Sequence, residues 1–384
     1  MRRIVGMLGA AAAALSLSAC GPPGTLAEQW DGTSWTLNPT TNPASWTDSI
    51  LNGVSCKAAS ACMAVGTYDT GSGNTATRLA LSEQWDGSSW TVQPTANPAG
   101  SVYANLNGVS CTSPTACTAV GFYGSDQPLA ERWDGTNWTV QPTPSPAGSS
   151  GVVLNGVSCT SATACIAVGD TSNTDAHGVS TGLPLAEVWD GTSWTTQTIP
   201  KPAGSPNISL NGVSCTSATV CIAVGYVQIN GAGNIPLAER WDGTSWTVQT
   251  TPNPTTSTSS ELSGVSCTSA TTCIAVGTYD TSGTNVNLLQ LVERWDGTSW
   301  TIQATPQQQS VLHGVSCTSD TACTAVGSYV SSTTTNGPPL AEVWDGTSWT
   351  TQTIPNEPGR TWGLLNAVFC TSVSACATVG HYNN

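Results

Sequence analysis

The stretch "VSCTSATACIAVG", Val157–Gly169, places two cysteines six positions apart, and close copies of it recur along the chain. The spacing Cys-x5-Cys occurs seven times, at Cys56 and Cys62, Cys111 and Cys117, Cys159 and Cys165, Cys215 and Cys221, Cys267 and Cys273, Cys317 and Cys323, and Cys370 and Cys376. A second signature, Trp-Asp-Gly-x-x-Trp, also occurs seven times and begins at Trp30, Trp85, Trp133, Trp189, Trp241, Trp295 and Trp344. The two signatures alternate with a period of 48 to 56 residues, so the chain is built from internal repeats.

Each repeat contains four short segments with strand character. We name them A ("LNGVSC"), B ("CIAVG" and about two more residues), C ("LAERW") and D ("SWTVQ"). The Asp-Gly between C and D predicts a tight hairpin, because glycine adopts the positive φ that such turns need. The proline-rich tail after D suits an exposed sheet edge. Four antiparallel strands in about fifty residues are typical of a β-propeller blade.

The two ends of the sequence predict a closed ring. The repeats begin with strands C and D (26–38) and end with strands A and B (365–382), so the two fragments together make the seventh blade. We therefore expect an all-β fold, a seven-bladed β-propeller in which residues 26–384 form one domain. The composition, with 39 glycines and 8% charged residues, suits short strands and turns. A solenoid or open array is the alternative, but it needs distinct capping repeats.

The "WDGTSW" hairpin resembles the Asp-box of bacterial neuraminidase repeats, although it is one residue shorter between Asp and Trp. It also resembles the Kelch-type pattern, without the paired glycines of that family. The resemblance covers residues 26–382 and implies a propeller. It implies no particular activity, because Asp-boxes are structural and occur in enzymes and in binding proteins alike.

The first residues have the pattern of an export signal. Arg2 and Arg3 precede an apolar run, Ile4–Leu17, that is short for a membrane span. Leu17-Ser18-Ala19-Cys20 resembles the lipobox of bacterial lipoproteins, which implies a cleaved signal peptide (1–19), a lipidated Cys20 and a short linker (20–25). An ordinary signal peptide is the alternative. We expect a protein outside the cytoplasm, held to the cell membrane by the acyl chains of Cys20.

The charge balance limits the classes of partner. The net charge is -14, and removal of residues 1–19 takes away Arg2 and Arg3, leaving 23 acidic against 7 basic side chains, or -16. An acidic surface without basic clusters argues against nucleic acid and against electrostatic binding to anionic lipid.

The fourteen repeated cysteines predict seven disulfides, each across the A–B hairpin with a five-residue loop between the end of strand A and the start of strand B. Exported chains keep such bonds, whereas seven metal sites would need more ligands than three histidines supply. The fifteenth cysteine is Cys20.

The repeated acids are interpreted as structural, because the same Glu and Asp stand in every blade. Each Asp is expected to accept backbone N–H bonds in its own turn, and each Glu to pair locally between strands or blades. The turn residues are Asp31, Asp86, Asp134, Asp190, Asp242, Asp296 and Asp345. The fourteen repeated tryptophans are interpreted as blade packing.

Length variation identifies a candidate functional face. The A–B and C–D turns are constant, whereas 9 to 17 residues separate the strand B Gly from the strand C Glu. Loops on a rigid scaffold are where binding sites form, so we place function on the face of the B–C loops. A candidate binding rim there is Tyr68, Tyr123, Tyr279, Tyr329 and Tyr382; the alternative is that these tyrosines pack between blades. Unrepeated residues near the same face are Trp46, Arg78, Tyr103, His177, His313 and Trp362.

The function expected is a non-enzymatic binding or scaffold module, a monomer that engages a protein or an envelope glycan. The alternative is an Asp-box-type glycoside hydrolase or lyase, which would need an arginine cluster to hold a substrate carboxylate. Arg132, Arg240 and Arg294 share one repeat register and are spread around the ring. No catalytic residue, cofactor or metal is predicted, and "DTSNTDAHG" (170–178) resembles a calcium loop only loosely.

Overall fold

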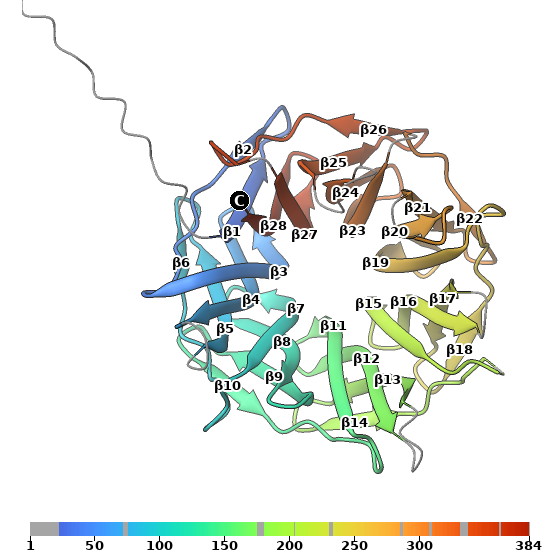
Figure 1. The fold of residues 1–384 in the computed structure, drawn as a ribbon, viewed down its shortest axis with the longest axis horizontal. Coiled ribbons are helices and arrows are strands. Elements are labelled where there is room, and N and C mark those ends of the chain that lie inside the picture. Colours follow the sequence, from blue (N-terminus) through green and yellow to red (C-terminus); the bar gives the residue numbers. More distant parts are fainter. Residues whose placement is uncertain are drawn as a thin grey trace, which may run out of the picture.

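The computed structural model describes residues 23–71, 76–174, 180–202, 204–229, 233–284, 287–306, 309–330, 337–360 and 362–383. These ranges contain seven antiparallel sheets of four strands each, arranged around a central axis (Figure 1), and no helix. The prediction of an all-β, seven-bladed propeller is confirmed.

The blades are numbered from the N-terminus. Blade 1 is formed by β27 (Trp362–Ser372), β28 (Ala375–Asn383), β1 (Gly24–Trp30) and β2 (Trp35–Leu37). Blade 2 is formed by β3 (Trp46–Ala58), β4 (Ala61–Thr70), β5 (Thr77–Trp85) and β6 (Trp90–Val92). Blade 3 is formed by β7 (Ala104–Ser113), β8 (Ala116–Tyr123), β9 (Gln127–Trp133) and β10 (Trp138–Gln141). Blade 4 is formed by β11 (Gly151–Ser161), β12 (Ala164–Thr174), β13 (Ser180–Trp189) and β14 (Trp194–Gln197).

The remaining three blades follow the same order. Blade 5 is formed by β15 (Ile208–Ser217), β16 (Val220–Ile229), β17 (Gly233–Trp241) and β18 (Trp246–Gln249). Blade 6 is formed by β19 (Ser259–Ser269), β20 (Thr272–Asp280), β21 (Leu288–Trp295) and β22 (Trp300–Ile302). Blade 7 is formed by β23 (Ser310–Ser319), β24 (Ala322–Tyr329), β25 (Pro339–Trp344) and β26 (Trp349–Gln352).

Blade 1 joins the two ends of the described chain. β1 pairs antiparallel with β28 from Gly24↔Tyr382 to Trp30↔Cys376, which gives the strand order β2-β1-β28-β27. The amide of Asn366 in this blade donates to the backbone oxygen of Leu51 in blade 2 at 2.8 Å. Strands from opposite ends of the sequence thus share one sheet, and that sheet bonds to the next blade.

The A–B hairpins are tighter than expected. Each strand A continues two residues past its cysteine, so that in blade 3 Cys111 pairs with Cys117 and, after a bulge, Ser113 pairs with Ala116. The predicted five-residue loop is therefore wrong, because the bulge lets the ladder continue to a two-residue turn. A second bulge lies at Asn107, near Gly121, where an added Cβ would overlap the backbone oxygen of Asn105. This close approach explains the glycine in strand B.

The predicted start of strand B is also wrong, by one residue. We expected strand B to begin at the second cysteine, but β20 begins at Thr272, one residue before Cys273, and β24 begins at Ala322, one residue before Cys323. The extra residue is Thr272 in blade 6 and Ala322 in blade 7, each paired with a serine of strand A beyond the bulge. Both cysteines therefore lie inside the ladder and not at its end.

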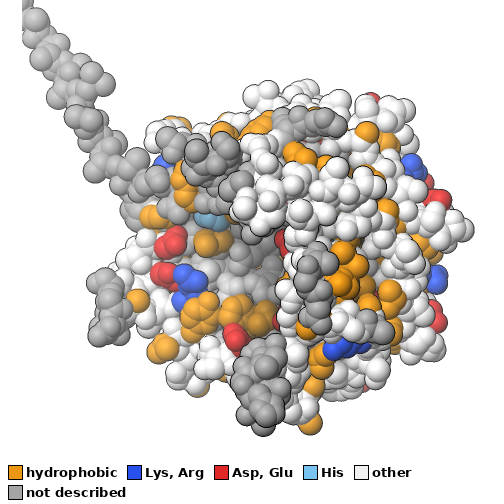
Figure 2. Space-filling view, turned by 45° about the vertical axis from the view of Figure 1, so that its right-hand side comes forward, with side chains coloured by type: hydrophobic (Ala, Val, Ile, Leu, Met, Phe, Trp, Pro, Cys, Tyr) orange, Lys and Arg blue, Asp and Glu red, His pale blue; other side chains and the backbone are white. Residues whose placement is uncertain are grey.

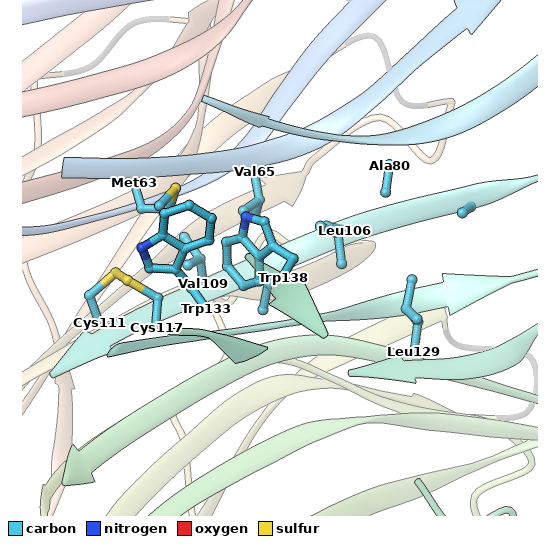
Figure 3. Packing of buried hydrophobic residues seen from close by; sticks show 12 residues of the cluster. Met63, Val65, Ala80, Leu106, Val109, Cys111, Cys117, Leu129, Trp133 and Trp138 are labelled. Atoms are coloured by element: carbon cyan, nitrogen blue, oxygen red, sulfur yellow. A yellow bond between two sulfur atoms is a disulfide. The ribbon is translucent and has the colours of Figure 1, made fainter. Parts of the chain in front are cut away.

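The hydrophobic core is divided into seven clusters, each joining one blade to the next. Between blades 2 and 3, Met63 and Val65 pack against Leu106 and the Trp133–Trp138 pair, whose rings lie 5.7 Å apart (Figure 3). Burial of these apolar surfaces is the main stabilising contribution, and it acts between blades as much as within them. A ring held together in this way is a rigid support for its loops.

Candidate functional site

Seven disulfides cross the A–B hairpins, with Cα–Cα distances of 3.9 to 4.0 Å. The predicted pairing is confirmed in every blade. The bonds join Cys56 to Cys62, Cys111 to Cys117, Cys159 to Cys165, Cys215 to Cys221, Cys267 to Cys273, Cys317 to Cys323, and Cys370 to Cys376. Disulfides of this number indicate an oxidising, extracytoplasmic environment. Cys20 lies outside the described residues, so its lipidation stays a prediction.

The disulfides also contribute to the core between blades, a role that the sequence analysis did not assign to them. Cys273 and Cys323, on strand B of blades 6 and 7, are 1% and 3% exposed. Cys273 belongs to the apolar cluster of Trp295, and Cys323 belongs to that of Trp344. The side chains of Cys273 and Cys323 are therefore buried parts of the core, and their sulfur atoms are not available to a ligand.

The seven turn aspartates lie on the face of the A–B and C–D turns. In blade 5, Asp242 Oδ1 accepts bonds from the N–H groups of Thr244 and Ser245, both at 2.8 Å, and from the Thr244 hydroxyl. Gly243, between Asp242 and Thr244, has φ +97°, the left-handed conformation that the turn requires. These bonds, the Ser245 N–H first, lower the pKa of Asp242 to about 2. The carboxylates are therefore occupied in their own turns, in a structural arrangement.

The five tyrosines of the candidate rim lie on the B–C face, and each is partly buried against an interblade cluster. The equivalent residues of blades 4 and 5, Thr171 and Val227, are 4% and 2% exposed. This position therefore serves packing between blades, the alternative interpretation from sequence. A ligand-binding role of the tyrosine rim stays a proposal.

Unrepeated aromatic residues gather on the B–C face where the ring closes. The guanidinium of Arg360 lies 4.5 Å from the ring centre of Tyr382, and Trp362 meets His381 edge-on at 6.0 Å. Trp46 and Tyr382 both border Gly24, since a Cβ there would lie 3.1 Å from the Trp46 ring and 2.7 Å from the Tyr382 hydroxyl. Trp46 begins strand A of blade 2, so these contacts connect blades 1 and 2.

The same surface continues into blade 3. Arg78 donates two hydrogen bonds to the carboxylate of Asp69, from Nε to Oδ1 at 2.7 Å and from Nη2 to Oδ2 at 2.8 Å. Its guanidinium lies 5.6 Å from the ring centre of Tyr103, and Tyr103 packs on Phe122 at 5.6 Å. The side chains of Arg78 and Asp69 keep 36% and 27% of their surface exposed, so the pair is accessible from solvent.

We name the following residues the aromatic arc: Trp46, Arg78, Tyr103, Phe122, Arg360, Trp362 and Tyr382. All of them lie at the B–C ends of blades 1 to 3, and Trp46 and Trp362 are the two tryptophans outside the repeat. Figure 2 shows charged side chains and a histidine gathered beside the hollow at the centre of the ring.

The remaining unrepeated residues have separate surroundings. His313 replaces the repeated strand A asparagine, and burial together with nearby His381 lowers its pKa to about 4. Asp170, the first residue of the calcium-like stretch, accepts a bond from the Ser209 hydroxyl at 2.7 Å; residues 175–179, with His177, lie outside the described ranges. The described residues contain no group of three or more His, Cys, Asp or Glu that could hold a metal ion.

The arginines required by a neuraminidase-like site are not brought together. Arg132 lies in β9, Arg240 in β17 and Arg294 in β21, on three different blades. Arg132 stacks on Trp189 of the next blade at 4.9 Å and donates to the backbone oxygen of Ala162 at 2.7 Å. This arginine therefore serves a blade interface. In the described part of the chain, no helix has the length and apolarity needed to span a membrane.

Comparison with known proteins supports the fold. No protein-family model and no curated protein matches the sequence. Among solved structures, the chain is similar to YCF48 from Cyanidioschyzon merolae (13% identity, 90% of this chain and 97% of that chain, TM-score 0.50). It is also similar to the RRP9 WD40 repeats (10% identity, 86% and 94%, TM-score 0.52) and to U3-55K (10%, 86% and 95%, TM-score 0.51). At these identities the likeness concerns the fold alone.

Proposed function

We propose that this propeller is a binding module that holds its ligand against the aromatic arc and catalyses no reaction. The observation that carries the proposal is the arc itself. The turns, disulfides and tryptophan pairs repeat in every blade, whereas the side chains of the arc form two groups of contacts on one face. Arg78 lies over Tyr103, which packs on Phe122, and in blade 1 Arg360 lies over Tyr382 while Trp362 meets His381. Aromatic and arginine side chains dominate the energetics of binding surfaces, because they bury large areas and keep polar edges.

The ligand we propose is a component of the cell envelope, either a protein or a glycan. The seven disulfides support a location outside the cytoplasm. Lipidation of Cys20 would hold the ring at the membrane surface, facing that environment. The hydrolase or lyase alternative gains no support from the arginines, which lie on separate blades.

Co-sedimentation with native cell envelope tests the proposed function. The oxidised protein is mixed with envelope before and after protease treatment. Binding to both preparations indicates a glycan, and binding lost after protease indicates a protein partner. If the protein sediments with neither, an envelope ligand is excluded and the proposal fails.

Two variants separate the aromatic arc from the rest of the surface. Arg78→Ala removes one of the two cations of the arc, and Thr139→Ala changes an exposed residue on outer strand β10. We expect Arg78→Ala to weaken sedimentation and Thr139→Ala to leave it unchanged. Equal binding by both variants would place the ligand elsewhere.

The anchor is tested separately by Cys20→Ser. We expect this variant to be released from the membrane, and the mature wild-type protein to carry acyl mass on Cys20. Release of the wild-type protein without detergent would contradict the anchor and leave the binding proposal intact.

A further inference from the structure

Each blade buries one glutamate of strand C completely. They are the strand C residues Glu28, Glu83, Glu131, Glu187, Glu239, Glu293 and Glu342, each 0% exposed. The side chains paired with them across the sheet offer few hydrogen-bond donors. Glu293, for example, lies between Ala275 on strand B and Ile302 on strand D.

Two of the seven glutamates accept a hydrogen bond from the preceding blade. The N–H of Ala96, in the connection that leads from blade 2 to blade 3, donates to Glu131 Oε2 at 3.1 Å. The amide of Gln290 in blade 6 donates to Glu342 Oε1 at 2.8 Å. Both donors come from outside the blade that carries the glutamate. In blade 3 the donor is a residue of the D–A connection, whereas in blade 7 it is a side chain of strand β21.

Proline occupies the Ala96 position in five of the seven D–A connections. The register is fixed by the preceding residue, because the hydroxyls of Thr95, Thr143 and Thr251 each donate to the backbone oxygen of the strand C residue fifteen positions earlier. The next residue is Ala96 in the first case and proline in the other two. The equivalent residues around the ring are Thr41, Ala96, Pro144, Pro200, Pro252, Pro306 and Pro355.

Proline has no N–H, so it cannot make the bond that Ala96 makes. Neither carboxylate oxygen of five glutamates, Glu28, Glu83, Glu187, Glu239 and Glu293, accepts a hydrogen bond from any residue that the structure describes. Four of the five follow a connection with proline at the Ala96 position, and Glu83 follows one with Thr41 there. The prediction of local pairing is wrong for these five, and in four cases the residue at the Ala96 position has no N–H to donate.

The protonation of the glutamates follows this geometry. Burial raises the pKa of Glu28 to about 9 and that of Glu187, Glu239 and Glu293 to about 8. Burial also raises the pKa of Glu131, but only to about 7, because the Ala96 N–H stabilises the ionised form. Burial raises the pKa of Glu83 to about 8, with Thr41 and Thr25 opposing it. No charged side chain contributes to any of these six shifts.

We propose that the buried glutamates of blades 1 to 6 make the propeller an acid-adapted ring, whose blade interfaces are intact while the carboxyl groups are protonated and weaken as they ionise. A buried carboxylate without donors is strongly unfavourable, whereas a protonated carboxyl group is tolerated. The prolines that cover four of these groups keep that penalty high.

The direction of the pH effect follows from the raised pKa values. The native state retains protons that the unfolded state releases near the ordinary glutamate pKa of 4.5, so stability falls as the pH rises toward 8 to 9. His313 and His381 act in the opposite direction, since burial lowers the pKa of each from 6.5 to about 4. As the pH rises above 6.5 the two histidines become neutral in the unfolded state as well, and the buried glutamates then make the main contribution to the slope.

Equilibrium unfolding of the full oxidised chain between pH 6.5 and 9 tests the proposal. We expect the unfolding constant to rise with pH over this range. Glu293→Gln, which keeps the shape and cannot ionise, reduces that slope by about one proton, or about tenfold in the constant per pH unit. A wild-type stability that is constant or increases from pH 6.5 to 8.5 would overturn the proposal.

A reciprocal pair of variants tests the role of proline. Pro252→Ala supplies an N–H above Glu293, and Ala96→Pro removes the one above Glu131. We expect Pro252→Ala to stabilise the protein more at pH 8.5 than at pH 6.5. We expect Ala96→Pro to destabilise it more at pH 8.5 than at pH 6.5. The difference between the two pH values is the readout, because a proline exchange also changes the unfolded chain independently of pH. Equal effects at both pH values would contradict the role of the connection.

Infrared spectroscopy of the native protein makes the test independent of unfolding. We expect the carbonyl band of protonated carboxyl groups to be present at pH 6.5 and to weaken in Glu293→Gln at the same pH. Absence of the band at pH 6.5 in the folded wild-type protein would show that the glutamates are ionised and would overturn the proposal.

Discussion

The two faces of the ring differ in how closely they follow the repeat. On the face of the A–B and C–D turns, every blade has the same aspartate turn, disulfide and tryptophan pair. On the B–C face, blades 1 to 3 carry the aromatic arc, and blades 4 to 7 have other residues at those positions, except that Tyr279 and Tyr329 of blades 6 and 7 are equivalent to Tyr382. The repeated residues therefore form the scaffold, whereas the residues that depart from the repeat are those available for a ligand.

The largest effect is expected on the B–C face. Trp46→Ala removes the aromatic side chain that borders Gly24 and Tyr382, and we expect retention on cell envelope to fall by at least about tenfold, as at a binding hot spot. Co-sedimentation at increasing envelope concentration measures this. The control is Val140→Ala on outer strand β10, which should bind as the wild type does. Wild-type retention of Trp46→Ala would show that the arc is not the binding surface.

The next effect concerns stability on the opposite face. Replacement of Cys215 and Cys221 together by alanine opens one hairpin disulfide, and we expect a loss of about 2 kcal/mol in the free energy of unfolding. Denaturant unfolding measures the loss, and envelope binding should be unchanged under conditions where the variant is folded. If this change weakened binding as much as Trp46→Ala does, the division between the two faces would be wrong.

A smaller effect is expected at one tryptophan of the scaffold. Trp138 Nε1 donates to the hydroxyl of Ser82 in the preceding blade at 3.1 Å. In the next interface, Trp194 packs near Ala130, and its Nε1 has no partner among the described residues. Ala130→Ser should therefore stabilise the ring by about 1 kcal/mol or less, and Ser82→Ala should destabilise it. Thermal unfolding of the two variants, which should shift in opposite directions, decides this.

The smallest effect belongs to the aspartate turns. Their hydrogen bonds lower the pKa of Asp190, Asp242, Asp296 and Asp345 to about 2, so the stability they provide is present above pH 3.8 and is lost as the pH falls toward 2. We expect a lower Tm at pH 2.5 than at pH 4.5, and a smaller difference in Asp242→Asn. A Tm that rises on this acidification would contradict the turn geometry.

The fold could be predicted because its signals are local and repeated. Asp242-Gly243 specifies a turn within four residues, and the cysteine spacing specifies a hairpin. The bulge beside each cysteine pair was missed, as at Cys273 and Cys323, since nothing in the stretch between the two cysteines marks the extra ladder pair.

The surroundings of the glutamates could not be predicted, because they depend on another blade. The N–H of Ala96 reaches Glu131 only when blades 2 and 3 are packed together, and nothing in either stretch of sequence marks this contact. The aromatic arc could be predicted from the sequence in part. Trp46 and Trp362 stand out in the sequence as unrepeated, but their proximity depends on the pairing of β1 with β28.

Hydrogen exchange of the oxidised protein, free and bound to solubilised envelope, shows which face of the ring the ligand covers. We predict slower exchange on binding at 46–48, 76–80, 102–105 and 362–366, which lie at the B–C ends of blades 1 to 3, with no change in the aspartate turns. Protection confined to the "WDGTSW" turns would contradict this prediction, because it would place the ligand on the repeated face.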